Sequence, residues 1–180
     1  MANYKVFEPI LLKQEGFYAK KKNDSGGETW EGIARNYYPN WPGWAIIDSY
    51  KSNPDFPHVL RSDVKLQALV DTFYETYFWD ELEGDNIQNQ SVANFLGDWG
   101  VNAGLSIPIK HAQLLIGVTS DGKMGPHTLS ALNAATNADF FSKLQQARIV
   151  FYEAVVQAHP EDKEFMSDWI ERTKSFTFQA

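Results

Sequence analysis

Apolar side chains recur at intervals of three and four residues along almost the whole of this 180-residue chain. One example is the stripe formed by Leu66, Leu69, Val70, Phe73 and Tyr77, which share one face, expected to be buried, if the segment is helical. Alternation with a period of two, the pattern of half-buried strands, never extends beyond a few residues. The sequence therefore predicts a mainly α-helical protein, whose second half has helices near residues 90–103, 107–117, 126–135, 138–158 and 162–174.

The first half contains an interruption of this helical pattern. Residues 19–29 are polar and rich in glycine, which is typical of a small hairpin or an irregular loop. After this stretch, Thr29 is expected to cap a short helix that continues through Tyr37. Further along, Ser62 is expected to cap a long helix that reaches Trp79.

The length and composition are those of a soluble globule with one core or two packed lobes. Hydrophobic residues make up 43% of the chain, enough for a full core without disulfide bonds. The segment Glu83-Gly84-Asp85-Asn86 is a pause between helices and a candidate lobe boundary. We therefore expect two lobes, residues 1–85 and 86–180, packed as one globule.

Several classes of function are excluded by what the sequence lacks. Without cysteine there can be no thiol nucleophile, disulfide or iron–sulfur cluster. The net charge of −7 argues against nucleic-acid binding, which needs a basic face. The histidines are far apart in the sequence, so no metal site and no cofactor is expected. No apolar run approaches the roughly 18 residues of a transmembrane helix, so no stable membrane insertion is expected.

The strongest chemical pattern is a pair of carboxylates in different surroundings. Glu15 lies at the end of a predicted amphipathic helix, on the same face as Leu11 and Tyr18, so burial should favour its protonated form. Asp24, in a polar turn, should stay ionised, and the hydroxyl of Thr29 could position a water or orient Asp24. Glycoside hydrolysis uses two carboxyl groups of this kind. The same residues are also common at helix ends and in loops, so this pattern alone leaves a structural role open.

A resemblance to a known family adds to this pattern. The chain reads Glu15-Gly16-Phe17-Tyr18, then Asp24-Ser25-Gly26-Gly27-Glu28-Thr29, then Gly32-Ile33. This order resembles the opening of the glycoside hydrolase family 108 lysozymes, whose signature runs Glu-Gly-Gly-Tyr, Asp-x-Gly-Gly-x-Thr and Gly-Ile. Residues 98–104 and 121–129 resemble the predicted peptidoglycan-binding region of the same proteins. Phe17 replaces a family glycine, and its ring is expected to pack inward.

This resemblance implies a lysozyme-like fold and an N-acetylmuramidase activity. Residues 1–85 would be the catalytic lobe and residues 86–180 the peptidoglycan-binding-like lobe. The substrate would be the β-1,4 bond between N-acetylmuramic acid and N-acetylglucosamine in bacterial peptidoglycan. Glu15 would be the general acid, Asp24 would stabilise the transition state or prepare a water, and Thr29 would support them. No metal or cofactor is implied.

Three further residues are expected to contact substrate. Tyr18 shares the face of Glu15, and Trp30 follows Thr29, although core packing is an equally simple role for a tryptophan. Asp98 lies beside an apolar stripe that contains Trp99, where it could hydrogen-bond at the rim of a groove. The alternative function is a non-catalytic wall-binding or structural module of a phage-like particle or secretion apparatus.

The N-terminal residues do not resemble a secretory signal peptide. We therefore expect synthesis in the cytoplasm and release to the cell wall by a holin or a dedicated export system, as for a phage or prophage endolysin.

Overall fold

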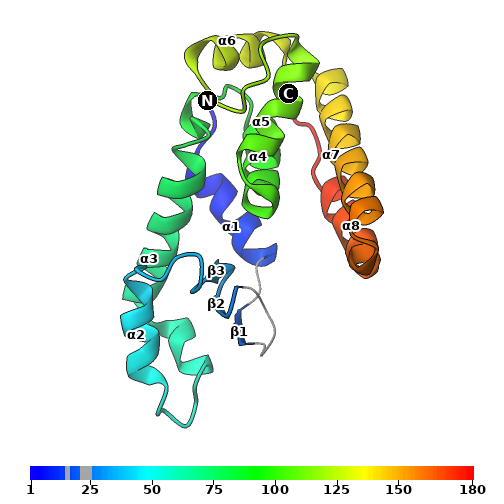
Figure 1. Cartoon of the computed structure of the whole chain (residues 1–180). Helices are drawn as coiled ribbons and strands as arrows, with labels where there is room; N and C mark the ends of the chain where they lie inside the picture. The colour runs from blue at the N-terminus through cyan, green and yellow to red at the C-terminus, as the bar shows by residue number, and fades with distance from the viewer. Residues whose placement is uncertain (15–16, 21–25) are drawn as a thin grey trace. The chain divides into compact units, whose positions relative to one another are not determined.

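The computed structural model describes residues 1–14, 17–20 and 26–180 (Figure 1). The chain forms two compact units, one made of Glu8–Tyr77 and the other of Met1–Phe7 together with Phe78–Ala180. The described residues contain eight α-helices and one small antiparallel sheet. The predicted class, a mainly α, lysozyme-like fold with a hairpin near residues 19–29, is confirmed. How function divides between residues 1–85 and 86–180 stays a prediction.

The Glu8–Tyr77 unit holds a three-stranded sheet and the helices that pack with it. Helix α1 precedes the sheet, and the strands follow in the order β1-β2-β3, each antiparallel to its neighbour. The elements are α1 (Tyr4–Gln14), β1 (Tyr18–Lys20), β2 (Glu28–Trp30), β3 (Ile33–Ala34), α2 (Gly43–Tyr50), a 3-10 turn (His58–Ser62), α3 (Val64–Tyr74) and a π-helical turn (Glu75–Trp79). The buried side chains of this unit include Leu11, Trp30, Ile33, Ile47, Leu60, Leu66 and Val70.

The segment after Thr29 corrects one of our expectations. Thr29 is the central residue of β2 and does not cap a helix to Tyr37. The next two residues, Glu31 and Gly32, have left-handed φ values of 43° and 82°. Two consecutive residues of this kind form the tight turn that joins antiparallel strands with the natural twist. The chain therefore reverses into β3, with Trp30 opposite Ile33.

Helix α3 begins one residue later than expected and ends earlier. Its cap is Asp63 rather than Ser62, because the Asp63 carboxylate accepts hydrogen bonds from the backbone N–H groups of Lys65 and Leu66, at 3.0 and 2.9 Å. The α-helix ends at Tyr74 and continues as the π-helical turn Glu75–Trp79.

The second unit is built from the five long helices that the sequence predicts. They are α4 (Gln90–Ala103), α5 (Ser106–Ile116), α6 (Pro126–Ala135), α7 (Ala138–Ala158) and α8 (Met166–Ser175), with 3-10 turns at Gly84–Asn86 and Pro160–Phe165. Trp99 is fully buried, as its apolar stripe predicts. Trp79 stacks on Phe7 with ring centroids 5.3 Å apart.

The segment around Asp121 is held by one buried amide. Gln113 is fully buried, and its Nε2 donates to the Asp121 carboxylate, the Lys123 carbonyl and the Thr128 hydroxyl at 2.8 to 3.0 Å. Its Oε1 accepts the Gly122 N–H at 2.9 Å. These bonds satisfy a buried polar group and fix the loop, so residues 121–129 pack the second unit together.

Candidate active site

The two carboxylates of the sequence prediction lie outside the described residues. Glu15 falls in the gap between α1 and β1, and Asp24 falls in the gap between β1 and β2. Their roles therefore stay predictions. The structure describes the chain again from Phe17 and from Gly26 onward, and these two residues lead into strands β1 and β2.

Thr29 lies on the less buried face of strand β2. Glu28 and Trp30 are buried on one side of β2, and Thr29 between them is half-buried on the other, as the alternation of a strand requires. The residues directly opposite Thr29 on the neighbouring strands are Ala19 and Ala34. Because cross-strand partners share a face, the methyl groups of these two alanines lie on the same side of the sheet as the Thr29 side chain.

Trp30 occupies the opposite, packed face. Its side chain has no exposed surface, and its ring contacts Phe17 with centroids 4.8 Å apart. Phe17 in turn lies under the Arg61 guanidinium, 4.1 Å from the ring centroid. The Phe17 ring therefore packs against this face, and Trp30 belongs to the core. The expectation that Trp30 contacts substrate is corrected, because the ring presents no surface to solvent.

Tyr18 lies on the same face as Trp30, its register partner. Its hydroxyl donates to Oε1 of Glu28 at 2.9 Å. Burial, followed by this hydrogen bond, raises the pKa of Tyr18 to about 12. The phenol therefore stays protonated near neutral pH and holds Glu28 in place. Its predicted contact with substrate stays a prediction.

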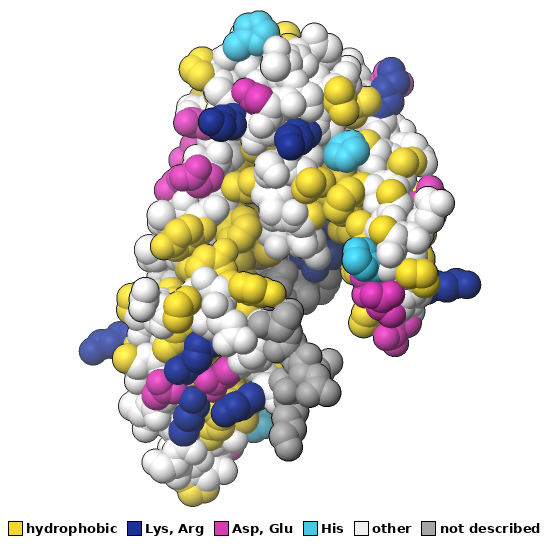
Figure 2. All heavy atoms as spheres, viewed as in Figure 1, with side chains coloured by type: hydrophobic (Ala, Val, Ile, Leu, Met, Phe, Trp, Pro, Cys, Tyr) yellow, Lys and Arg dark blue, Asp and Glu magenta, His cyan; other side chains and the backbone are white. Residues whose placement is uncertain are grey.

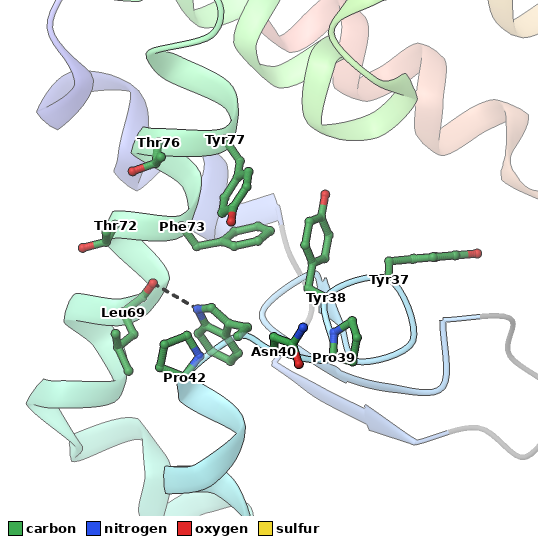
Figure 3. A pocket seen from close by; sticks show the side chains of 11 residues that line it. Tyr37, Tyr38, Pro39, Asn40, Pro42, Leu69, Thr72, Phe73, Thr76 and Tyr77 are labelled. Carbon is green, nitrogen blue, oxygen red and sulfur yellow. Dashed lines mark hydrogen bonds between the residues drawn. The ribbon is translucent and has the colours of Figure 1, made fainter.

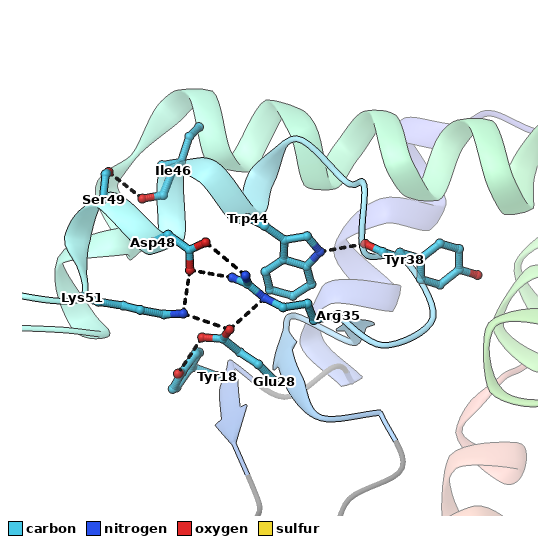
Figure 4. A network of polar contacts seen from close by, with 9 residues as sticks. All are labelled: Tyr18, Glu28, Arg35, Tyr38, Trp44, Ile46, Asp48, Ser49 and Lys51. Atoms are coloured by element: carbon cyan, nitrogen blue, oxygen red, sulfur yellow. Dashed lines mark hydrogen bonds and ion pairs between the residues drawn. The ribbon is translucent and has the colours of Figure 1, made fainter.

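Glu28 is the centre of an ion network that joins the sheet to α2 (Figure 4). The Glu28 Oε2 lies 2.8 Å from Nε of Arg35 and 3.1 Å from Nζ of Lys51. Both cations also bind Asp48, at 2.7 and 2.6 Å. The hydrogen bonds from Arg35 first, and then those from Lys51, hold the pKa of Asp48 well below its ordinary value. Two cations thus neutralise two carboxylates and fix the strand that carries Thr29.

This network was not predicted from the sequence. Asp48 and Lys51 are three residues apart on a helix, a spacing that does indicate a local pair. Glu28 and Arg35 are joined to them only by the folding of the sheet, and no local pattern reveals that.

A third carboxyl group, Glu31, lies in the turn between β2 and β3. Its backbone N–H donates to the Phe17 carbonyl at 2.7 Å, and its carbonyl accepts from the Tyr74 hydroxyl at 2.6 Å. Its side-chain Oε1 accepts from Nε2 of Gln67 at 3.2 Å. Burial raises the pKa of Glu31 above its ordinary value. The Glu31 backbone is thus bonded to Phe17, two residues after Glu15 in the sequence.

Asp98 is placed differently from our expectation. It is fully buried in the second unit, and its two oxygens lie 2.8 Å from Nη1 of Arg148 and 2.8 Å from Nη2 of Arg172. A carboxylate enclosed by two guanidinium groups does not line a groove rim. Asp98 therefore joins α4 to α7 and α8, and the expectation that it contacts substrate is corrected.

The electrostatic character of the described surface is mixed. On the face drawn in Figure 2, Lys and Arg side chains lie among Asp and Glu side chains. Within the described ranges, no group of three or more His, Asp or Glu side chains is arranged to hold a metal ion. None of the helices in those ranges has both the length and the apolar character needed to cross a membrane.

Comparisons with known proteins define the class and then the family. Residues 107–174 match the family described as Predicted Peptidoglycan domain, and residues 9–104 match the family described as Glycosyl hydrolase 108. The chain is a glycoside hydrolase that acts on peptidoglycan. It belongs to the glycosyl hydrolase 108 family, as the motifs from Glu15 to Ile33 indicate.

One solved structure supports the fold independently. SagA from Brucella abortus shares 20% identity with this chain and superposes with a TM-score of 0.64. The match covers 98% of this chain and 97% of SagA. At this identity the likeness concerns the fold alone. A search among curated proteins finds no match.

Proposed function

We propose that this protein is an N-acetylmuramidase that hydrolyses the β-1,4 bond between N-acetylmuramic acid and N-acetylglucosamine. The observation that carries the proposal is the match of residues 9–104 to a glycosyl hydrolase family, since this match spans Glu15, Asp24 and Thr29. The partial exposure of Thr29 on β2 supports it, because a residue that supports the attacking water has to be accessible to solvent.

The proposed roles follow the chemistry of glycoside hydrolysis. Glu15 protonates the leaving glycosidic oxygen, Asp24 stabilises the positive charge that develops on the sugar ring or orients the attacking water, and Thr29 supports that water. The water adds to the anomeric carbon as the bond to the leaving oxygen breaks. The Glu28 network acts on this site as a positioning device, because it fixes the strand on which Thr29 lies.

The decisive experiment replaces Glu15 by Gln and measures the release of reducing ends from purified peptidoglycan. Loss of a general acid lowers the rate by about 10²- to 10⁴-fold. The matched control is Glu31→Gln, since Glu31 is a half-buried carboxyl in the turn after β2, and burial raises its pKa. We expect this control to retain most of the activity. Near-wild-type turnover by a folded Glu15→Gln variant would refute the role of Glu15.

The identity of the cleaved bond needs a separate measurement. Mass spectrometry of the reduced products distinguishes muramic acid ends from glucosamine ends. Reduced muramic acid at the new ends is the expected result. Reduced glucosamine ends would instead assign the chain as an N-acetylglucosaminidase.

The route to the substrate is also part of the proposal. Peptidoglycan lies outside the cytoplasmic membrane, and we propose that a holin or a dedicated export system releases the protein, as for a phage endolysin. Lysis of host cells that depends on co-expression of a holin would support this. Efficient export of the chain alone through the general secretory route would contradict it.

A further inference from the structure

The Glu8–Tyr77 unit contains an aromatic pocket that none of the proposed catalytic residues lines. Its volume is about 450 Å³, within the usual range for small-ligand sites. One wall is the loop from Tyr37 to Pro42, and the other is a face of α3 and the π-helical turn. The residues from the second wall are Leu69, Thr72, Phe73, Thr76 and Tyr77.

Aromatic rings form a continuous surface in this pocket (Figure 3). The Phe73 centroid lies 4.6 Å from that of Tyr38 and 5.0 Å from that of Tyr77. Tyr77 is 55% exposed, so its ring faces solvent at the mouth of the pocket. Tyr37 is 64% exposed, and its ring extends beyond Tyr38 at the outer end of the loop wall (Figure 3). Tyrosine combines a flat apolar body with a hydroxyl that can hydrogen-bond at a wet surface.

The loop wall is fixed before any ligand binds. Nε1 of Trp41 donates to the Leu69 carbonyl at 3.4 Å and so joins the loop to α3. Nε1 of Trp44 donates to the Tyr38 carbonyl at 2.7 Å, and the Trp44 ring lies 4.4 Å from the Arg35 guanidinium. The loop is therefore attached to the same ion network that supports β2. A rigid wall reduces the entropy lost on binding.

The charge of the lining selects the kind of ligand. All eleven lining residues are uncharged, and their polar side-chain groups are hydroxyls, the Asn40 amide and the indole N–H of Trp41, which is bonded to the Leu69 carbonyl. A carboxylate placed here would lose hydration without gaining a cationic partner. The net charge of −7 also gives an anionic ligand no attraction at long range. A neutral ligand with apolar faces and a polar rim is the better match.

We propose that this pocket binds a neutral N-acetylglucosamine unit of a glycan strand, with the sugar's C–H face on the exposed tyrosine rings. Of the two sugars in peptidoglycan, N-acetylglucosamine has no charged substituent, whereas N-acetylmuramic acid carries a lactyl group with its anionic peptide. The pocket thus favours one sugar of the repeat, and it also binds peptide-free oligomers of N-acetylglucosamine. The inference rests on the proposed function for its choice of glycan.

Binding of triacetylchitotriose, the neutral trimer of N-acetylglucosamine, tests this inference by isothermal titration calorimetry on the full chain. We expect millimolar or tighter binding, weakened about tenfold by Tyr77→Ala and by Tyr37→Ala, because each change removes one stacking ring. Tyr77→Phe keeps the ring and should bind within about twofold of wild type. The control is Phe165→Ala, an exposed aromatic residue of the other unit, with no expected change.

Three results would overturn the inference. They are absence of trimer binding, equal binding by wild type and both alanine variants, and preference of the pocket for an anionic muropeptide over the neutral trimer. The Tyr37→Ala variant, in an exposed loop position, provides the answer if Tyr77→Ala does not fold. Binding by Glu15→Gln separates this inference from the proposed function, since trimer binding does not need the general acid and peptidoglycan cleavage does.

Discussion

Removal of the Asp98 carboxylate should destabilise the second unit more than any single surface change. The carboxylate contacts Arg148, which has no exposed side-chain surface, and Arg172, whose side chain is 14% exposed. The guanidinium of Arg148 is further surrounded by the rings of Phe95 and Tyr152, with centroids 5.3 and 5.5 Å away. In Asp98→Ala this buried cation keeps its aromatic neighbours but loses its ionic partner.

The expected cost follows from that burial. Breaking a buried pair by removal of one partner costs about 3–5 kcal/mol, because the remaining charge is neither hydrated nor paired. Such a loss is a large part of the roughly 5–15 kcal/mol that stabilises a typical domain. Replacing Arg172 by Gln should cost less, about 1–3 kcal/mol. It removes charged hydrogen bonds but leaves the ion pair between Asp98 and Arg148 intact.

Urea unfolding followed by tryptophan fluorescence and far-ultraviolet circular dichroism measures these differences. The matched control is Asp139→Ala, which breaks an exposed ion pair with Lys143 on α7 and should cost less than about 0.5 kcal/mol. We expect the free energy of unfolding to fall in the order Asp139→Ala, Arg172→Gln, Asp98→Ala. If Asp98→Ala costs no more than the Asp139 control, the reasoning from buried charge is wrong.

Two further predictions concern pH. The pKa of Asp48 is lowered in the folded protein, so the stability that the Asp48 carboxylate contributes is present above its ordinary pKa of about 3.9 and is lost as the pH falls. The difference in unfolding free energy between wild type and Asp48→Asn should therefore shrink on acidification. A difference that stays constant with pH would contradict the role of Asp48 in the ion network. The pKa of Glu31 is raised, so the folded state loses stability relative to Glu31→Gln as the pH rises above about 4.3, the ordinary pKa of Glu. Thermal unfolding of both proteins across a pH series measures this difference in stability. Parallel curves of stability against pH for the two proteins would contradict the raised pKa of Glu31.

The helices of the second unit were predicted well because their signal is local. An apolar stripe such as the one containing Trp99 needs only the spacing of neighbouring residues, and the structure buries that side chain completely. The same rule failed at Tyr77, which the stripe of α3 places in the core. The π-helical turn from Glu75 to Trp79 changes the number of residues per turn, so the apolar face rotates and Tyr77 points outward.

The candidate site was harder to predict because its contacts are long-range. Asp98 looked like an accessible polar residue beside an apolar stripe, yet one of its cations, Arg172, is 74 residues away in the sequence. Glu28 was overlooked because a strand of three residues gives almost no periodic signal. The sequence therefore indicates the catalytic motif, whereas the ion network that holds strand β2 in place is visible only in the folded structure.

The two-residue turn at Glu31 and Gly32 determines which residue of β3 faces the interior. Neighbouring positions on a strand project in opposite directions, so inserting or deleting a single residue in the turn would shift the pairing with β3 by one step. Because β2 stays paired with β1, the slip would fall on β3: the buried Ile33 side chain would point away from the interior, and Ala34 would take its place. Changes in the length of this turn would for that reason remove a core side chain from beside Trp30, even where the rest of the molecule could accommodate them.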